Sequence, residues 1–410
     1  MSSPTYPLVL DLAGRRAVVV GGGPVAARRA TALVAAGADV LVVAPWVCED
    51  LRDLVGSGAV TWLARDHTAG DLDGAWIVHT ATGDPGTDDL VAAHAEGARL
   101  WCVRADDASL SAAWTPAVAR AGDVTVAVTA GGDPRRATTL RDAVALALDT
   151  GALPLRHHRA ATTGQVALVG GGPGDPGLIS VRGRRLLAEA DVVLVDRLAP
   201  RALLDDLDPS VLIVDVGKTA GHHPLPQEEI NQLLVEHGQA GRRVVRLKGG
   251  DPFVLGRGGE EALACIAAGV PVEVVPGVTS AFAVPAHAGI PVTHRGRSRQ
   301  VTIASGHEGL DWSSLAAVEG TLVLLMGVAG LAVAATELVA HGKAASTPVA
   351  IVESGFSPAE RTTVGTLATI ASLARERDVQ PPAVIVIGDV VDLHSALGSS
   401  DTSGSSGSSG

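Results

Sequence analysis

An apolar stretch that runs directly into a glycine-rich loop constrains this chain more than any other feature. Residues 244–248 read Val-Val-Arg-Leu-Lys and are followed by Gly249, Gly250, Asp251 and Pro252. Such a run predicts a buried strand of a parallel sheet, and glycines at its carboxyl end let backbone amides and carbonyls approach a bound molecule. A plain strand-to-helix turn has the same pattern. We therefore expect an α/β fold with either a ligand loop or a tight turn here.

A second glycine-rich loop lies near the N-terminus. The run 17–20 is Ala-Val-Val-Val, and Gly21, Gly23 and Ala26 follow it in a G-x-G-x-x-A pattern before an Ala- and Arg-rich stretch. In this context the glycines permit a tight turn close to a pyrophosphate, which then faces a helix N-terminus. No Asp or Glu follows Val43 at the end of the next apolar run, so the choice between NAD and NADP stays open. We expect a dinucleotide to be bound by Gly21, Gly23, Pro24, Val25 and Ala26.

Composition limits the class of protein. The chain has 410 residues, 47% of them apolar but only 2% aromatic, so cores must be built from Ala, Val and Leu. A net charge of −12 argues against a nucleic-acid partner. Three separated cysteines fit a reducing cytoplasm, and no apolar run reaches the roughly 18 residues of a membrane span. We expect a cytoplasmic protein with no signal peptide and no membrane contact.

The chain is expected to contain two α/β halves and a tail. Residues 1–148 alternate valine-rich runs with helical stretches, which predicts βαβ units of a Rossmann-like domain. The predicted strands there are Arg16–Val20, Asp39–Val43, 76–80 and Val124–Val128. Residues 149–163 are predicted to be a linker, 164–394 a second α/β domain, and the Ser/Gly-rich 395–410 a disordered tail.

Several segments of the second half occur in a recognisable order. They are 169–177, 195–198, 216–221, 244–261, 276–280 and 325–327. This set resembles the uroporphyrinogen-III C-methyltransferases of the tetrapyrrole methylase family. The resemblance implies a two-lobed α/β domain that uses S-adenosyl-L-methionine. The glycine run 170–174 is not a second Rossmann loop, because Asp175 and Pro176 stand where the helix should begin.

The resemblance also implies roles for single residues. Asp196 matches the proposed base and Lys218 the essential lysine; each, taken alone, also fits a surface ion pair. Cofactor contacts are implied for Pro173, Gly249, Gly250, Asp251, Val254, Thr279, Ser280, Met326 and Gly355, although Met326 also fits a core position. The substrate carries eight carboxylates, which suits a cationic cluster. That cluster comprises Arg257, His294 and Arg295, joined by Arg297 and Arg299, for which a solvated charge run is equally plausible.

Residues 6–148 resemble precorrin-2 dehydrogenase/sirohydrochlorin ferrochelatase. The resemblance rests on segments 18–29, 80–84 and 100–107. It implies that Thr82 contacts the dinucleotide and that Asp106 handles protons in dehydrogenation and in chelation. Alternatively, Asp106 and Asp107 only cap a helix that begins near Ala108. The chain departs from the family at Val103, where Asn is common.

The two resemblances together imply the reactions of the siroheme synthase family. These reactions are the double methylation of uroporphyrinogen III to precorrin-2, the NAD-dependent oxidation of precorrin-2 to sirohydrochlorin, and the insertion of Fe²⁺ as a substrate. The residues that bind the metal, and whether the product also enters cobalamin synthesis, are left open. We expect a homodimer held mainly by 164–394, because 134–163 leaves room for one good helix, 137–148. Two alternatives remain: a methyltransferase whose N-terminal half only binds nucleotide or oligomerises, and a non-catalytic tetrapyrrole carrier or nucleotide sensor.

Overall fold

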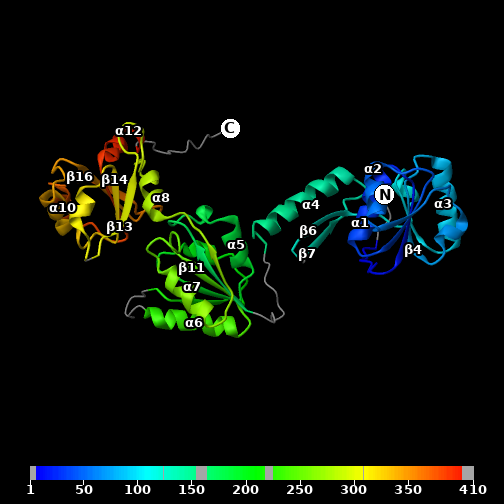
Figure 1. The fold of residues 1–410 in the computed structure, drawn as a ribbon, viewed down its shortest axis with the longest axis horizontal. Helices are drawn as coiled ribbons and strands as arrows, with labels where there is room; N and C mark the ends of the chain where they lie inside the picture. The colour runs from blue at the N-terminus through cyan, green and yellow to red at the C-terminus, as the bar shows by residue number, and fades with distance from the viewer. Residues whose placement is uncertain (1–5, 123, 154–163, 218–224, 308, 399–410) are drawn as a thin grey trace, which may run out of the picture. The chain divides into compact units, whose positions relative to one another are not determined.

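The computed structural model describes the chain except for both ends and four internal gaps. The described residues are 6–122, 124–153, 164–217, 225–307 and 309–398. They fall into two compact units, Met1–Ala145 and Leu146–Gly410 (Figure 1).

The first unit is built on a parallel five-stranded sheet with helices on both faces (Figure 1). The strand order is β3-β2-β1-β4-β5, all parallel, as expected for a Rossmann-like domain. The strands are β1 (Arg16–Val20), β2 (Asp39–Val43), β3 (Val60–Leu63), β4 (Ala75–Thr80) and β5 (Trp101–Arg104). The helices are α1 (Pro24–Ala35), α2 (Glu49–Gly56) and α3 (Pro85–Gly97), with 3₁₀ turns η1 (Ala69–Leu72) and η2 (Ala108–Leu110).

Alternation along β1 explains why this sheet is covered on both faces. Val19 packs in one core with Leu33 of α1, whereas Val18 packs in the other with Val91 of α3. Successive side chains of a strand point to opposite faces, so an unbroken apolar run needs a helix layer on each side. The aliphatic run predicted as a strand therefore determines the layering.

The end of the first unit differs from the predicted βαβ pattern. The run Val124–Val128 is strand β7, but it pairs antiparallel with β6 (Ala117–Ala121) in a separate two-stranded sheet. Its half-exposed alternation suits one covered face rather than a fully buried parallel strand. Helix α4 (Pro134–Asp149) follows and is longer than the expected 137–148.

The second unit contains two lobes. The first lobe has a parallel sheet in the order β10-β9-β11-β8-β12, with helix α5 and the 3₁₀ turns on one face and α6 and α7 on the other. Its strands are β8 (Gln165–Gly170), β9 (Val192–Val195), β10 (Leu212–Asp215), β11 (Arg243–Lys248) and β12 (Val272–Val275). Its helices are α5 (Val181–Ala188), α6 (Gln227–Gln239) and α7 (Gly258–Ala267), with 3₁₀ turns η3 (Pro176–Leu178) and η4 (Arg201–Leu204). As expected, no α-helix begins directly after the glycine run, because Asp175 caps the 3₁₀ turn η3.

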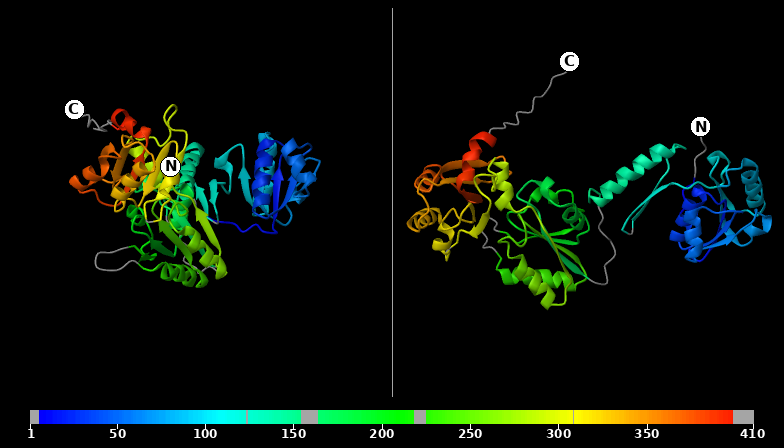
Figure 2. Two further views of the ribbon diagram at one scale, coloured as in Figure 1. Left: turned by 60° about the vertical axis from the view of Figure 1, so that its left-hand side comes forward. Right: turned by 45° about the horizontal axis from the view of Figure 1, so that its top comes forward.

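The second lobe is a mixed sheet in the order β13-β14-β17-β15-β16 (Figure 2 shows both lobes from two further directions). Among its neighbouring strand pairs, β13 and β14 are parallel, and the other three pairs are antiparallel. The strands are β13 (Val301–Ser305), β14 (Thr321–Leu325), β15 (Pro348–Glu353), β16 (Arg361–Thr366) and β17 (Ala383–Ile387). Helices α9 (Trp312–Ala316), α10 (Leu331–Ala340) and α11 (Ile370–Glu376) pack on one face. The other face is covered by α8 (Ser280–His287) and the 3₁₀ turn η5 (Asp389–Leu393), which α12 (His394–Leu397) follows. Two lobes were expected, and they are found. Across the described residues, no helix combines the length and apolar character that crossing a membrane requires.

Candidate active sites

The carboxyl end of β1 forms a bare backbone surface in the first unit. Gly21 has φ of +131°, and a Cβ atom there would overlap the carbonyl oxygen of Ala81. A Cβ atom on Gly22 would overlap the carbonyl oxygen of Trp46. At Gly23 the space is open within 4 Å, and this residue precedes α1 without a side-chain cap.

This geometry fits a dinucleotide. The amides of the first helical turn lack intrahelical partners, and no side chain of Gly23 occupies them, so they can bind a pyrophosphate. The predicted Pro24, Val25 and Ala26 form that first turn. Thr82 lies beside it, since its amide nitrogen would be 3.2 Å from a Cβ atom on Gly21.

Asp88 holds the Thr82 loop in place. Its carboxylate is buried, and Oδ1 accepts from the Thr82 hydroxyl at 2.7 Å and from the hydroxyl of Thr80. The Thr82 amide also donates to this oxygen at 3.3 Å, so Asp88 fixes both the side chain and the main chain of Thr82. Sequence reasoning missed Asp88, whose only signal was an acidic residue in the first turn of a helix.

Asp106 follows β5 and is held by the arginine at the end of that strand. Arg104 donates to it from Nη2 at 2.6 Å and from Nε at 2.9 Å. This hydrogen-bonded pair lowers the pKa of Asp106 to about 2. The cap of η2 is Asp107, whose Oδ1 accepts from the Ser109 amide at 2.8 Å. The alternative of Asp106 as a helix cap is therefore wrong for this residue.

In the second unit, three loops meet at the carboxyl edge of the first-lobe sheet. Gly250, with φ of +66°, donates to the carbonyl of Gly172 at 2.7 Å and accepts from its amide at 3.2 Å. Asp251 Oδ2 accepts from the amide of Gly277 at 3.0 Å, and its Oδ1 accepts from Phe253 at 2.8 Å. The structure thus brings together most of the predicted cofactor residues: Pro173, Gly249, Gly250, Asp251, Val254, Thr279 and Ser280.

These loops suit a ligand that contacts backbone. A Cβ atom on Gly250 would find no atom nearer than 3.5 Å, the Ser280 amide, with the Ser280 hydroxyl at 3.9 Å. Both oxygens of Asp251 already accept loop amides, so its side chain shapes the loops. The arrangement therefore offers S-adenosyl-L-methionine backbone groups and hydroxyls rather than a free carboxylate.

The two remaining predicted cofactor residues come from the second lobe. Gly355 lies next to the glycine loop, because its carbonyl oxygen would be 3.4 Å from a Cβ atom on Gly174. Met326 follows β14 with φ of +56° and is 47% exposed. A core position for Met326 is therefore wrong.

Asp196 lies directly after β9 and contacts a buried arginine. Arg246 donates from Nη2 to Asp196 Oδ1 at 3.3 Å and from Nε to Glu261 Oε1 at 3.0 Å. The same Glu261 oxygen accepts from Lys248 at 3.1 Å and from Gln227 at 3.2 Å. Arg246, Lys248 and Glu261 are each buried, so a charge network lies beneath Asp196.

Sequence reasoning missed this network. Burial lowers the pKa of Lys248, whose positive charge is partly balanced by Glu261. The sequence of β11 did indicate buried charges, because two cations at alternate positions interrupt a Val- and Leu-rich strand. Buried charges need partners, and the partner is found only in the folded structure, on α7.

Lys218 lies outside the described residues. The preceding Gly217 packs against Arg197, since a Cβ atom on Gly217 would be 2.6 Å from the Arg197 amide nitrogen. Gly217 therefore lies beside the residue that follows Asp196.

The predicted cationic cluster is divided by the structure. Arg257 is exposed, has φ of +60°, and pairs with Glu260 at 2.7 Å. His294 and Arg295 are exposed in the turn between α8 and β13. Arg297 instead pairs with Asp392 at 2.9 Å and donates to the carbonyl of Asp389. Arg299 is also exposed.

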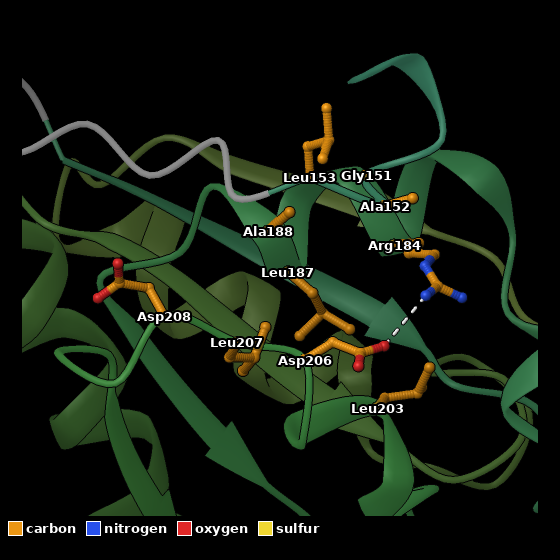
Figure 3. Close-up of a pocket in the computed structure, with 10 residues that line it drawn as sticks. All are labelled: Gly151, Ala152, Leu153, Arg184, Leu187, Ala188, Leu203, Asp206, Leu207 and Asp208. Atoms are coloured by element: carbon orange, nitrogen blue, oxygen red, sulfur yellow. Dashed lines mark hydrogen bonds and ion pairs between the residues drawn. The ribbon is translucent and has the colours of Figure 1, made fainter. Parts of the chain in front are cut away.

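A small pocket in the second unit is a separate feature. Figure 3 shows Arg184 and Asp206, 3.2 Å apart, at one side of it. The other lining residues are Gly151, Ala152, Leu153, Leu187, Ala188, Leu203, Leu207 and Asp208. None of the predicted site residues lines this pocket, so it is not the candidate site.

Across the described residues, no group of three or more His, Cys, Asp or Glu side chains is arranged to hold a metal ion.

Comparison with known proteins agrees with this division into two halves. Residues 165–371 match the family of tetrapyrrole (corrin/porphyrin) methylases, and residues 8–117 match a putative NAD(P)-binding family. The chain is 37% identical to a siroheme synthase of Pseudomonas entomophila, over 95% of this chain and 97% of that protein. It is 54% identical to an S-adenosyl-L-methionine-dependent uroporphyrinogen III methyltransferase of Methanosarcina barkeri, over 58% of this chain and 96% of that one.

A solved structure supports the fold of the second unit. The crystal structure of uroporphyrin-III-C-methyltransferase from Thermus thermophilus aligns with a TM-score of 0.50 and 38% identity, over 58% of this chain and 98% of that one. Because the match to a siroheme synthase extends over nearly the whole length of both proteins, the chain belongs to the siroheme synthase family, with an NAD(P)-binding half followed by a tetrapyrrole methylase half.

Proposed function

We propose that the chain catalyses successive reactions of siroheme biosynthesis. Two methyl transfers convert uroporphyrinogen III to precorrin-2 in the second unit, and NAD-dependent oxidation to sirohydrochlorin and insertion of Fe²⁺ follow in the first. One observation carries this proposal: each unit has a glycine-rich sheet edge with a carboxylate held by a buried arginine. The pairs are Asp106 with Arg104 and Asp196 with Arg246.

In the second unit we assign Asp196 as the base. When bound, S-adenosyl-L-methionine supplies the methyl group, and each transfer leaves a ring proton to be removed. Asp196 is 36% exposed on one side and contacts Arg246 on the other, so it can face a substrate while remaining oriented. Lys218 is assigned as the second catalytic residue, by resemblance to the family.

Substrate carboxylates are assigned to exposed cations. Arg257, His294 and Arg295 are exposed, and a guanidinium group can bind a carboxylate through two parallel hydrogen bonds. Arg257 already binds the exposed Glu260 in this way, so a substrate carboxylate would replace Glu260 there. Arg297 is left out, because its guanidinium already binds Asp392 and the Asp389 carbonyl. Because the protein carries a net charge of −12, such a local cluster is what draws a polyanionic substrate.

In the first unit we assign Asp106 to proton handling. Oxidation of precorrin-2 transfers one hydride to NAD and releases one proton, and metal insertion releases pyrrole protons. The nicotinamide cofactor is assigned to the turn of Gly21, Gly23 and the first residues of α1, with Thr82 at its edge. Support comes from the uncapped helix N-terminus at Gly23.

We further propose the domain limits 1–148, 149–163, 164–394 and 395–410, and a homodimer held mainly by 164–394. The alignment with the Pseudomonas entomophila protein extends over 450 positions, more than the 410 residues of this chain. At least some segment of that relative is therefore missing here. Among the described residues between β7 and β8, α4 is the one helix.

A cytoplasmic location is supported by three free thiols, Cys48, Cys102 and Cys265.

Stepwise omission of reactants tests the proposed function. Purified protein is mixed with uroporphyrinogen III, S-adenosyl-L-methionine, NAD and Fe²⁺, and products are separated and identified by absorbance and mass. We expect precorrin-2 without NAD, sirohydrochlorin without Fe²⁺, and siroheme with all four. Precorrin-2 as the end product in every mixture would instead show a methyltransferase with an inactive first unit.

Sedimentation of fragments tests the assembly. Residues 164–394 are expected to be dimeric at micromolar concentration, and residues 1–150 monomeric or weakly associated. A monomeric methylase fragment beside a tight dimer of the first fragment would contradict the proposed arrangement.

A further inference from the structure

Arg104 is a buried arginine that contacts two carboxylates on different elements. Its side chain is 4% exposed, and its Nη1 lies 2.5 Å from Asp89 Oδ1 on α3. Its Nη2 and Nε contact both oxygens of Asp106. The guanidinium therefore connects helix α3 to the loop that follows β5.

The two contacts differ in what they can do. Asp89 is 67% exposed and bound through one oxygen, which is typical of a surface ion pair of small energy. Asp106 is 26% exposed and bound through both oxygens, which restrains the rotation of its carboxylate. The main chain of Arg104 is restrained as well, because its amide donates to Ser111 Oγ at 2.9 Å.

We infer that Arg104 is a positioning residue for the oxidation step: it holds the Asp106 carboxylate in one orientation, and in ionised form, at the carboxyl edge of β5. This inference rests on the proposed dehydrogenase function, in which Asp106 is the acting carboxylate. It assigns a role to an arginine that neither the glycine pattern nor the resemblance singled out.

The groups around Asp106 show why the arginine favours this ionised state. Besides Asp106, the titratable groups that interact with Arg104 are Asp89 of α3, Asp107 of the loop and the thiol of Cys102 on β5, which in turn lies near Asp88. Hydrogen bonding to Arg104 lowers the pKa of Asp106 to about 2, whereas partial burial raises it. Without the arginine, the hydrogen bonds and the positive charge that lower the pKa of Asp106 are lost, so this pKa rises.

Three variants of the full chain separate positioning from simple mechanical support. Arg104→Met removes the cation, Arg104→Lys keeps the charge but loses the planar fork, and Asp89→Asn removes only the negative charge of the contact with α3. The Met variant is expected to fold, because the two carboxylates it releases are partly exposed and can be hydrated. Precorrin-2 is supplied as substrate, so that methylation is not part of the measured step.

The pH profile of NAD-dependent oxidation is the decisive readout. For Arg104→Met we expect kcat to fall about tenfold or more at an unchanged KM for NAD, with the acid limb moved up by about 1 to 3 pH units. The sign follows from the carboxyl: its pKa rises, so a step that needs the carboxylate is lost at a higher pH. For Arg104→Lys, kcat and the position of the acid limb should lie between those of Arg104→Met and the wild type. For Asp89→Asn, both should match the wild type.

Two results would overturn the inference. One is an acid limb that stays at the wild-type pH in both folded Arg104 variants. The other is an equal loss of kcat in Asp89→Asn and Arg104→Met, which would make the arginine a strut between α3 and the loop. If the wild-type protein itself failed to oxidise precorrin-2 with NAD, the proposed function would fail instead.

Discussion

Arg246 Nη2 lies 3.3 Å from Asp196 Oδ1, so the proposed base of the methylase half is tied to a cation inside the sheet. The same arginine binds Glu261, which is fully buried and also binds Lys248. Among the described residues, Glu261 Oε2 has no hydrogen-bond partner. Asp196 therefore contacts one end of a buried charge network whose balance depends on a single glutamate.

Replacing that glutamate should destabilise the second unit. Glu261→Gln leaves Arg246 and Lys248 buried with less counter-charge, and we expect a loss of about 3–5 kcal/mol in the free energy of unfolding. The adjacent Glu260→Gln is the matched control, because Glu260 pairs with Arg257 on the surface and should cost less than about 1 kcal/mol. Urea unfolding measures both, with the transition of the second unit identified by its shift with S-adenosylhomocysteine. An equal free energy of unfolding for the two variants would show that the charge of Glu261 does not stabilise the second unit.

Removing either proposed catalytic residue of the methylase half should stop methyl transfer but not cofactor binding. For Asp196→Asn and Lys218→Ala we expect the rate to fall by a factor of about 100 or more. Asp206→Asn is the control, because this exposed carboxylate pairs with Arg184 away from the glycine loops. Calorimetric titration with S-adenosyl-L-methionine should give wild-type affinity for all three. Loss of cofactor binding in both catalytic variants, with the fold retained, would reject the assigned roles.

Two adjacent aspartates provide a matched pair in the first unit. Asp106→Asn should stop precorrin-2 oxidation while both methyl transfers continue. The amide keeps the shape of the side chain, but unlike a carboxylate it cannot act as a proton acceptor. Asp107→Asn should oxidise precorrin-2 at close to the wild-type rate, since Asp107 caps η2 and Asn also serves as a cap. Accumulation of precorrin-2 is followed by absorbance. Near wild-type oxidation by Asp106→Asn would exclude its assigned role.

Adjacent glycines separate folding from cofactor binding. Gly22→Ala places a methyl group into the carbonyl oxygen of Trp46, so the first unit should be destabilised by about 1–3 kcal/mol. Gly23→Ala places its methyl group in open space, so stability should change by less than about 1 kcal/mol while NAD binding weakens. Thermal unfolding and a fluorescence titration with NAD distinguish the two effects. Unchanged NAD affinity in Gly23→Ala would place the pyrophosphate elsewhere.

Local pattern was sufficient for the strands and for the glycine turns. Arg16–Val20 and Asp39–Val43 form strands with these bounds, because unbroken aliphatic runs are stable only between two helix layers. The turn at Gly21 was also predicted from local pattern, and its φ of +131° favours glycine, whereas the close approach of the Ala81 carbonyl is a tertiary contact. The pairing of β7 is also local, because β7 pairs antiparallel with the strand directly before it and Ala121 lies opposite Val124; the expectation of a βαβ unit missed this hairpin.

The partners of charged residues were decided at two different ranges. Those of Asp106 and Asp107 lie close in sequence, because Arg104 is two residues before Asp106 and η2 begins directly after Asp107. Arg246 and Glu261 are separated by an entire loop and meet because β11 and α7 pack together. Sequence therefore determined the fold class and the positions of both glycine-lined edges. The buried ion pairs beneath the edge of the methylase half were decided by packing. Their energy depends on the distance between side chains, and these side chains are far apart in the sequence.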